Sequence, residues 1–135
     1  MANCVWANKL EIDTTGSGGY NTIANLESLE LSIDGTVQDW YSMDGEGFAN
    51  NLKTAIKVTL NGTAKVTDGD TGNDYIRGMM FAVCDDAASS FRLTLADETV
   101  VTADCTVNVT GGLGAAEDVD QIEFELHMNG KPNIT

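Results

Sequence analysis

Positive charge is scarce in this 135-residue chain: seven Lys and Arg residues stand against 21 Asp and Glu residues, giving a formal net charge of -14. Binding to nucleic acid through a basic patch requires clustered Lys and Arg side chains, and anionic lipid repels a strongly negative protein. The composition therefore argues against a basic nucleic-acid-binding protein and against a membrane-surface protein. No apolar run reaches the roughly 18 residues of a membrane span, so membrane insertion is not expected.

Cysteine and histidine are scarce as well. Cys4, Cys84 and Cys105 are odd in number and lack a CxxC spacing, which favours free thiols in a reducing compartment. His127 is the only histidine, so neither a zinc site nor a nucleophile with a positioned base is expected. The first residues also lack the basic and apolar segments of a signal peptide. We therefore expect no metal, no cofactor and no enzymatic activity.

Alternation of apolar and polar residues is the strongest structural pattern, and it is typical of strands with one buried face. The clearest case is "QIEFELHM", where the apolar and polar sets are Ile122, Phe124, Leu126 and Met128 against Gln121, Glu123, Glu125 and His127. The same pattern predicts further strands whose core-facing residues are Leu29, Leu31 and Ile33; Ile56, Val58 and Leu60; Phe91, Leu93 and Leu95; and Val101, Ala103, Cys105, Val107 and Val109.

Local signals predict where these strands end. The dipeptides Asp34-Gly35 and Asn61-Gly62 have hairpin-turn chemistry, and residues 96–99 are expected to turn between two strands. Apolar residues at helical spacing between Tyr75 and Val83 predict one short helix over residues 72–84, despite Gly78. The sum is about seven short strands and one helix, which predicts an all-β fold with one short helix, either an antiparallel β-sandwich or a partly open barrel.

The length predicts a single domain. Residues 1–21 contain "TTGSGG" and little periodicity, so they are expected to form an amino-terminal arm or loop, with a possible short strand near residues 10–12. Residues 22–135 carry the strand pattern and are expected to form the β-domain.

Three candidate sites have ordinary structural explanations beside the functional ones. The acidic loop at residues 68–74 suggests calcium, but the glycine and glutamate of a calcium loop are missing, so turn and cap chemistry is favoured. Glu123 and Glu125 suggest acid–base catalysis, but a solvated strand face has the same pattern. Four aromatic residues suggest a sugar platform, although core packing of Trp40 and anchoring of a loop or a subunit contact by Phe48 are favoured. The four are Trp6, Trp40, Tyr41 and Phe48.

The order of several motifs resembles the major tail tube proteins of long-tailed bacteriophages. The motifs are "MDGEGF", a strand with Lys53 and Lys57, "GDTGNDYI" at residues 69–76, and a "GG…AED" loop before a strand that ends "NGKP". No single motif is diagnostic, and the resemblance covers roughly residues 22–135. It implies a β-sandwich or split barrel with one flanking helix, and a structural, non-catalytic virion protein.

The resemblance also implies partners. Six subunits close into a ring whose inner sheets join into a β-barrel, and rings stack into a tube around the tape-measure protein and later conduct DNA. Tail terminator and distal tail or baseplate proteins would bound the tube, and the protein would be assembled in the host cytoplasm and located in the virion. DNA would pass without specific binding, because a carboxylate-lined wall makes no phosphate contacts.

Residues can be proposed for two surfaces of such a tube. The acidic strand faces supply the lumen candidates Glu30, Asp34, Glu123 and Glu125. The loop at residues 43–51 and the lysine strand supply the subunit-contact candidates Met43, Asp44, Phe48, Lys53 and Lys57. Two alternatives remain: the acidic faces are solvated outer surfaces, or the chain is a secreted or surface β-sandwich that binds carbohydrate or calcium.

Overall fold

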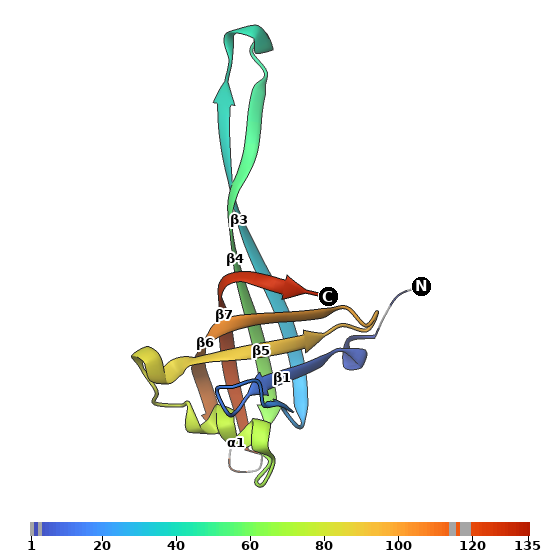
Figure 1. Ribbon diagram of the computed structural model, residues 1–135, viewed down its shortest axis with the longest axis vertical. Coiled ribbons are helices and arrows are strands. Elements are labelled where there is room, and N and C mark those ends of the chain that lie inside the picture. Colours follow the sequence, from blue (N-terminus) through green and yellow to red (C-terminus); the bar gives the residue numbers. More distant parts are fainter. Residues whose placement is uncertain (1, 3, 114–115, 117–119) are drawn as a thin grey trace.

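The computed structural model describes residues 2, 4–113, 116 and 120–135, and within them seven antiparallel strands form one open sheet (Figure 1). The strands are β1 (Lys9–Asp13), β2 (Tyr20–Thr22), β3 (Leu26–Tyr41), β4 (Ala49–Lys65), β5 (Ala88–Thr94), β6 (Val100–Leu113) and β7 (Gln121–Ile134). Their order in the sheet is β2-β1-β5-β6-β7-β4-β3. One α-helix, α1 (Thr71–Gly78), accompanies them, so the expected all-β fold with one short helix is confirmed. None of the described helices is long and apolar enough to cross a membrane.

The sheet folds over itself, and the hydrophobic core lies between its two halves. In Figure 1, β1 and β5 cross the lower parts of β7, β4 and β3 at a steep angle. The apolar residues of β7 meet those of β1 and β5 in one buried cluster, together with residues of β4, β6 and α1. Ile122, Phe124 and Leu126 are buried as predicted, and Met128 packs against the cluster.

Strands β3 and β4 are much longer than expected and form a hairpin that projects from the body (Figure 1). Strand β4 pairs with β7 only from Thr59 to Lys65, so the part of the hairpin beyond has no other neighbour in the sheet. The predicted turns at Asp34-Gly35 and Asn61-Gly62 are wrong, because both dipeptides lie inside paired strands. Gly62 has a packing reason instead: a Cβ atom there would approach Phe124 Cζ to 2.6 Å.

A β-bulge interrupts the hairpin at Thr54. Thr36 pairs with Ala55, and the next pair is Val37 with Lys53, so Thr54 has no partner on β3. An extra residue in one strand reverses the side to which the following residues of that strand point. Lys57 therefore projects from one side of the sheet and Lys53 from the other, where it lies across Gly35.

Helix α1 is shorter than the predicted range of residues 72–84. It starts at an Asp70 cap that accepts a hydrogen bond from Asn73 N at 3.0 Å, and it ends at Gly78. Glycine is a poor helix former, and the chain then turns through η3 (Cys84–Ala87) into β5. Ile76 and Met79 are buried, whereas Val83, which was assigned to the helix, is exposed.

Part of the expected amino-terminal arm belongs to the sheet. The possible strand at residues 10–12 is confirmed as β1, where Leu10 and Ile12 are buried. Glu11 is also buried and accepts two hydrogen bonds from Arg92 of β5, at 3.3 and 2.5 Å. The predicted loop at residues 111–118 is described only in part: Gly111 to Leu113 extend β6, and residues 114, 115, 117 and 118 lie outside the described residues.

Candidate functional site

One side of strands β3, β4, β7 and β6 is polar across all four strands. The register of the pairs aligns Glu30, Asn61, Glu125 and Asn108 in one row, and Ser32, Thr59, His127 and Thr106 in the next. We call this surface the polar face. Its members are Ser28, Glu30, Ser32 and Asp34 of β3; Lys57, Thr59, Asn61, Thr63 and Lys65 of β4; Gln121, Glu123, Glu125 and His127 of β7; and Thr106 and Asn108 of β6.

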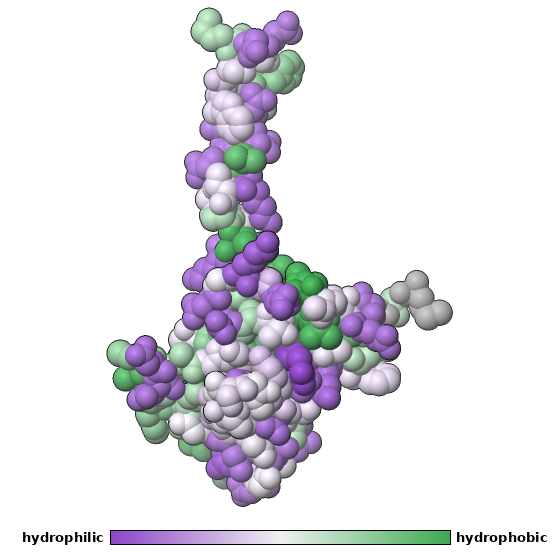
Figure 2. Space-filling model, in the orientation of Figure 1, coloured by the Kyte–Doolittle hydropathy of each residue, from purple (hydrophilic) through white to green (hydrophobic). Residues whose placement is uncertain are grey.

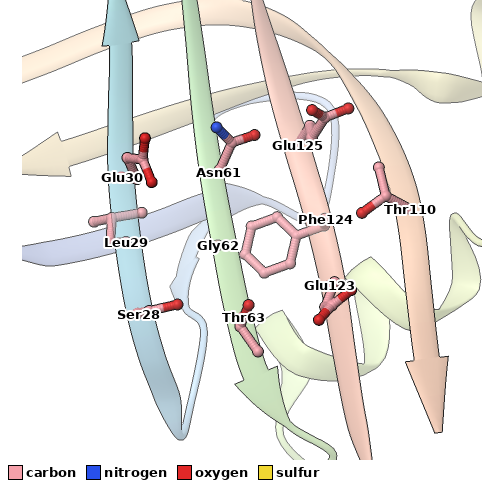
Figure 3. A pocket seen from close by; sticks show the side chains of 10 residues that line it. All are labelled: Ser28, Leu29, Glu30, Asn61, Gly62, Thr63, Thr110, Glu123, Phe124 and Glu125. Carbon is pink, nitrogen blue, oxygen red and sulfur yellow. The ribbon is translucent and has the colours of Figure 1, made fainter.

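The polar face combines carboxylates with uncharged hydrogen-bonding groups. All four residues proposed for the lumen, namely Glu30, Asp34, Glu123 and Glu125, lie on it. Glu125 accepts a hydrogen bond from Asn108 Nδ2 at 3.1 Å, and its Oε1 is 3.4 Å from His127 Nε2. Figure 3 shows Glu30, Asn61, Glu123 and Glu125 around a shallow groove of about 470 Å³. The sequence thus identified these carboxylates, and the structure adds that they share one surface.

The opposite side of the same four strands is apolar and is covered by the rest of the protein over its lower part. Phe124 and Leu126 of β7 point into the core, where Ile76 and Met79 at the α1 end also pack. The polar face therefore belongs to the side of the sheet that carries no second layer.

The five candidates for subunit contact all lie on the projecting hairpin, but not on one surface. Met43 and Asp44 belong to η2 (Met43–Gly45) at its tip, and Phe48 follows with 77% of its surface exposed. Lys53 and Lys57 lie on opposite sides of the strand pair because of the bulge at Thr54. Figure 2 shows apolar side chains scattered among polar ones along this hairpin.

Two other candidate sites do not form. Trp6 lines a groove with Leu26 and Leu29 at the beginning of β3, whereas Trp40 and Tyr41 are at its end. An extended strand of that length separates them by tens of ångströms, so they make no common platform, and Trp40 is exposed on the hairpin and does not pack in the core.

The acidic residues at 68–74 serve the local fold. Asp70 accepts hydrogen bonds from the backbone N–H groups of Ala24 and Asn73 at 3.2 and 3.0 Å. Asp68 and Asp74 both contact Arg77 Nη1, at 2.7 and 3.4 Å. Turn and cap chemistry is thus confirmed. Among the described residues, no three acidic, histidine or cysteine side chains gather in a way that could hold a metal ion.

Strands β6, β7, β4 and β3 form the part of the sheet that carries the polar face, which we call the four-stranded sheet. It has two free edges, and sequence reasoning did not locate them. Strand β3 pairs with β4 alone, so its outer edge is open along its whole length in the described part of the chain. Strand β6 pairs with β5 only from Val100 to Thr106, and residues 107–113 have β7 as their one described partner. Open edges expose unpaired backbone N–H and C=O groups and favour pairing with another strand.

Comparison with known proteins connects this geometry to a fold. No family model matches the chain, and no curated protein matches it. Among solved structures, a chain of the tail of an empty gene transfer agent particle with six-fold symmetry matches with a TM-score of 0.82 and 22% identity, over 99% of both chains. A chain of a native gene transfer agent virion matches with a TM-score of 0.77 and 19% identity, again over 99% of both chains.

A more distant match extends the same fold to a contractile system. A chain of the sheath–tube complex of an extracellular contractile injection system, in its extended state, matches with a TM-score of 0.64 and 10% identity, over 99% of this chain and 91% of that one. The resemblance found in the sequence is thus confirmed at the level of the fold: the chain has the fold of chains from this tail, this virion and this sheath–tube complex.

Proposed function

We propose that the protein is a structural, non-catalytic subunit of the tail tube of a phage or phage-like particle. The observation that carries the proposal is the four-stranded sheet with one polar face and two free edges. Its four strands alternate in direction, so β3 and residues 107–113 of β6 run antiparallel to each other. An edge of one copy can therefore pair with the opposite edge of the next in an all-antiparallel ring.

Six copies are the proposed ring size, because the tail with a matching subunit has six-fold symmetry. Four strands from each of six copies make 24 strands. At a strand spacing of about 4.8 Å and a tilt between zero and about 40°, such a barrel measures roughly 37–48 Å between opposite backbones. Side chains narrow the bore, and the remaining width still admits a DNA duplex.

The polar face would line this bore. Its strands carry a second layer on the apolar side only, so a ring built through the free edges would have the polar face inside and β1, β5 and α1 outside. Carboxylates in the lining make no counterion-releasing contacts with phosphate and repel a duplex close to the wall. Salt screens this repulsion beyond about 8 Å, which keeps the effect local. The tube would enclose a tape-measure protein and later conduct DNA without binding it.

The projecting hairpin would join successive rings. Its tip extends far from the body and exposes Met43 and Phe48, which a partner surface can bury. Tail terminator and distal tail or baseplate proteins would contact the rings at the two ends. Assembly would take place in the host cytoplasm, and the mature protein would be located in the virion.

Negative-stain electron microscopy of the concentrated protein tests the proposal. Hollow filaments or six-membered rings are the expected result. A stable monomer at all concentrations, with a melting temperature that rises on addition of calcium or glycan, would instead identify the alternative binding module, since a ligand of the native state stabilises it.

A further inference from the structure

An exposed apolar segment lies between α1 and β5. Its side chains are Met80, Phe81 and Val83, and the last two expose 90% and 70% of their surface. In Figure 1 this part of the chain and the following η3 project beyond the left ends of β5 and β6, and Figure 2 shows apolar side chains there. This stretch of the chain lies away from the projecting part of the β3–β4 hairpin in Figure 1. We call residues 80–83 the apolar segment.

The apolar segment stands beside one free edge of the four-stranded sheet. Strand β5 begins at Ala88, which pairs with Thr106, the residue of β6 after which the free edge begins. The preceding η3 also contacts β6. Met79, directly before the segment, is buried in the core on the apolar side of the sheet. If a strand of another copy paired with residues 107–113, the apolar segment would therefore lie on the apolar side of that strand.

The other free edge carries a matching apolar surface. Leu31 and Ile33 of β3 were expected in the core, but they expose 50% and 55% of their surface, and Ile56 of β4 lies beside them with 56% exposed. They project from the side of the sheet opposite the polar face. Ile56 also borders a pocket of about 380 Å³ that is lined by Met128 and residues 130–132 of β7, but half or more of each of the three side chains stays exposed.

The two apolar surfaces lie at the same level of the sheet. One row of register partners runs from Thr106 through His127 and Thr59 to Ser32. Leu31 and Ile33 flank Ser32, and Ala88 pairs with Thr106 at the other end of the row. In a ring, strand tilt shifts neighbouring copies by a few residues along the strands. The apolar residues of β3 follow one another along the strand, so the contact can form over a range of such shifts.

We infer that the apolar segment of one copy covers Leu31, Ile33 and Ile56 of the next copy in the ring. The inference rests on the proposed function, because it requires two copies joined edge to edge. The contact is head to tail, and such contacts close into rings when the rotation between copies allows it. Each junction would then have two parts: backbone pairing between strand edges, and an apolar clasp on the outer side of the wall.

A native thiol allows a direct test. Cys84 is exposed and directly follows Val83, while Cys105 is buried. In a Cys4→Ser background, a second thiol is introduced on β3 as Leu31→Cys, Ser32→Cys, Ile33→Cys or Asp34→Cys. Assembled protein is treated with an oxidant or a short bifunctional thiol reagent, and covalent multimers are separated under denaturing conditions. A disulfide requires Cα atoms within about 7 Å, and the reagent extends that reach.

Crosslinking should follow a two-residue period along β3. Leu31→Cys and Ile33→Cys should give ladders of up to six chains, at least fivefold stronger than those of Ser32→Cys and Asp34→Cys, and an added Cys84→Ser should abolish them. Rings that form normally but give no ladder, or equal ladders for all four variants, would overturn this inference and leave the proposed function standing. If the unmodified protein forms neither rings nor tubes, the proposed function fails, and this inference fails with it.

Discussion

Asp34 of β3 and Lys57 of β4 are direct partners across an antiparallel pair, and both project from the polar face. Both side chains are exposed, so their attraction contributes at most about 1 kcal/mol. Lys53 is on the opposite side, so Lys57 and Lys65 are the two lysines of the polar face, against its four carboxylates. The net charge of this surface therefore stays negative.

Charge reversal on the polar face should impair DNA release. In particles that carry Glu123→Lys and Glu125→Lys, the lining would gain phosphate-binding groups, and the fraction of particles that eject their DNA should fall, most strongly at low salt. Glu123 is exposed and Glu125 half-buried, so the melting temperature of the subunit should change little. Ejection is measured as DNA accessible to a nuclease.

A matched pair of substitutions controls for net charge. Asp97→Lys and Glu98→Lys make the same change in charge in the turn between β5 and β6. This variant should eject DNA normally. Equal ejection by both variants at low salt would show that the polar face does not line the channel.

Loss of Phe48 should weaken assembly more than folding. Because its ring is largely exposed on the hairpin, Phe48→Ala should lower the free energy of unfolding by less than about 0.5 kcal/mol. The concentration required for tube formation should rise by about tenfold, which corresponds to 1.4 kcal/mol per contact. Light scattering gives this concentration, and urea denaturation gives the stability. Phe48→Leu keeps an apolar contact and should have the smaller effect; parallel losses of stability and assembly would contradict the prediction.

Two glycine substitutions should change stability in opposite directions. Gly62→Ala places a methyl group 2.6 Å from Phe124 Cζ and should cost about 1–3 kcal/mol of unfolding free energy. Gly78→Ala meets no atom within 4 Å at the end of α1 and should add about 0.5–1 kcal/mol. Urea denaturation of both variants checks the pair, and a neutral Gly62→Ala would mean that Phe124 can move without loss of packing.

The three thiols should differ in reactivity. Burial, with a smaller effect of the Asp104 charge, raises the pKa of the Cys105 thiol from 9.0 to about 12. A maleimide at pH 7.5 should therefore label Cys4 and Cys84 in the native protein, and Cys105 only after unfolding. Mass spectrometry of the labelled chain distinguishes the cases.

The same raised pKa predicts a pH dependence of stability. Only the unfolded chain releases the Cys105 proton between pH 9 and about 12, so this contribution is complete below pH 9 and declines as the pH rises. Cys105→Ala should flatten that decline. A native Cys105 labelled as fast as Cys84 would contradict both expectations.

Much of the strand pattern could be predicted, because burial on one side produces alternation directly. The apolar set of β7 is an example, as Ile122, Phe124 and Leu126 are all buried. Alternation alone does not say what covers the apolar side. Leu31 and Ile33 have the same pattern but are exposed, because they lie on β3, an edge strand of the sheet.

A turn could be predicted from the sequence only where interactions between neighbouring residues alone determine the backbone conformation. Residues 96–99 do form the turn between β5 and β6. At Asn61-Gly62 the glycine instead makes room for a ring from β7, 62 residues away in the chain, and no local rule contains that contact. The carboxylates of the candidate site were identified from alternation, but the free edges beside them depend on which strands pair.

The bulge at Thr54 divides one strand pair into two parts that can vary separately. Below it, pairing with β7 holds the register of β4, so the charge pattern of the polar face is fixed by three neighbouring strands. Between the bulge and the tip, β3 and β4 pair only with each other among the described strands. In the proposed tube, substitutions or changes of length at the tip would therefore alter how copies connect and leave the polar face unchanged, so tubes of different rigidity would share the same lining.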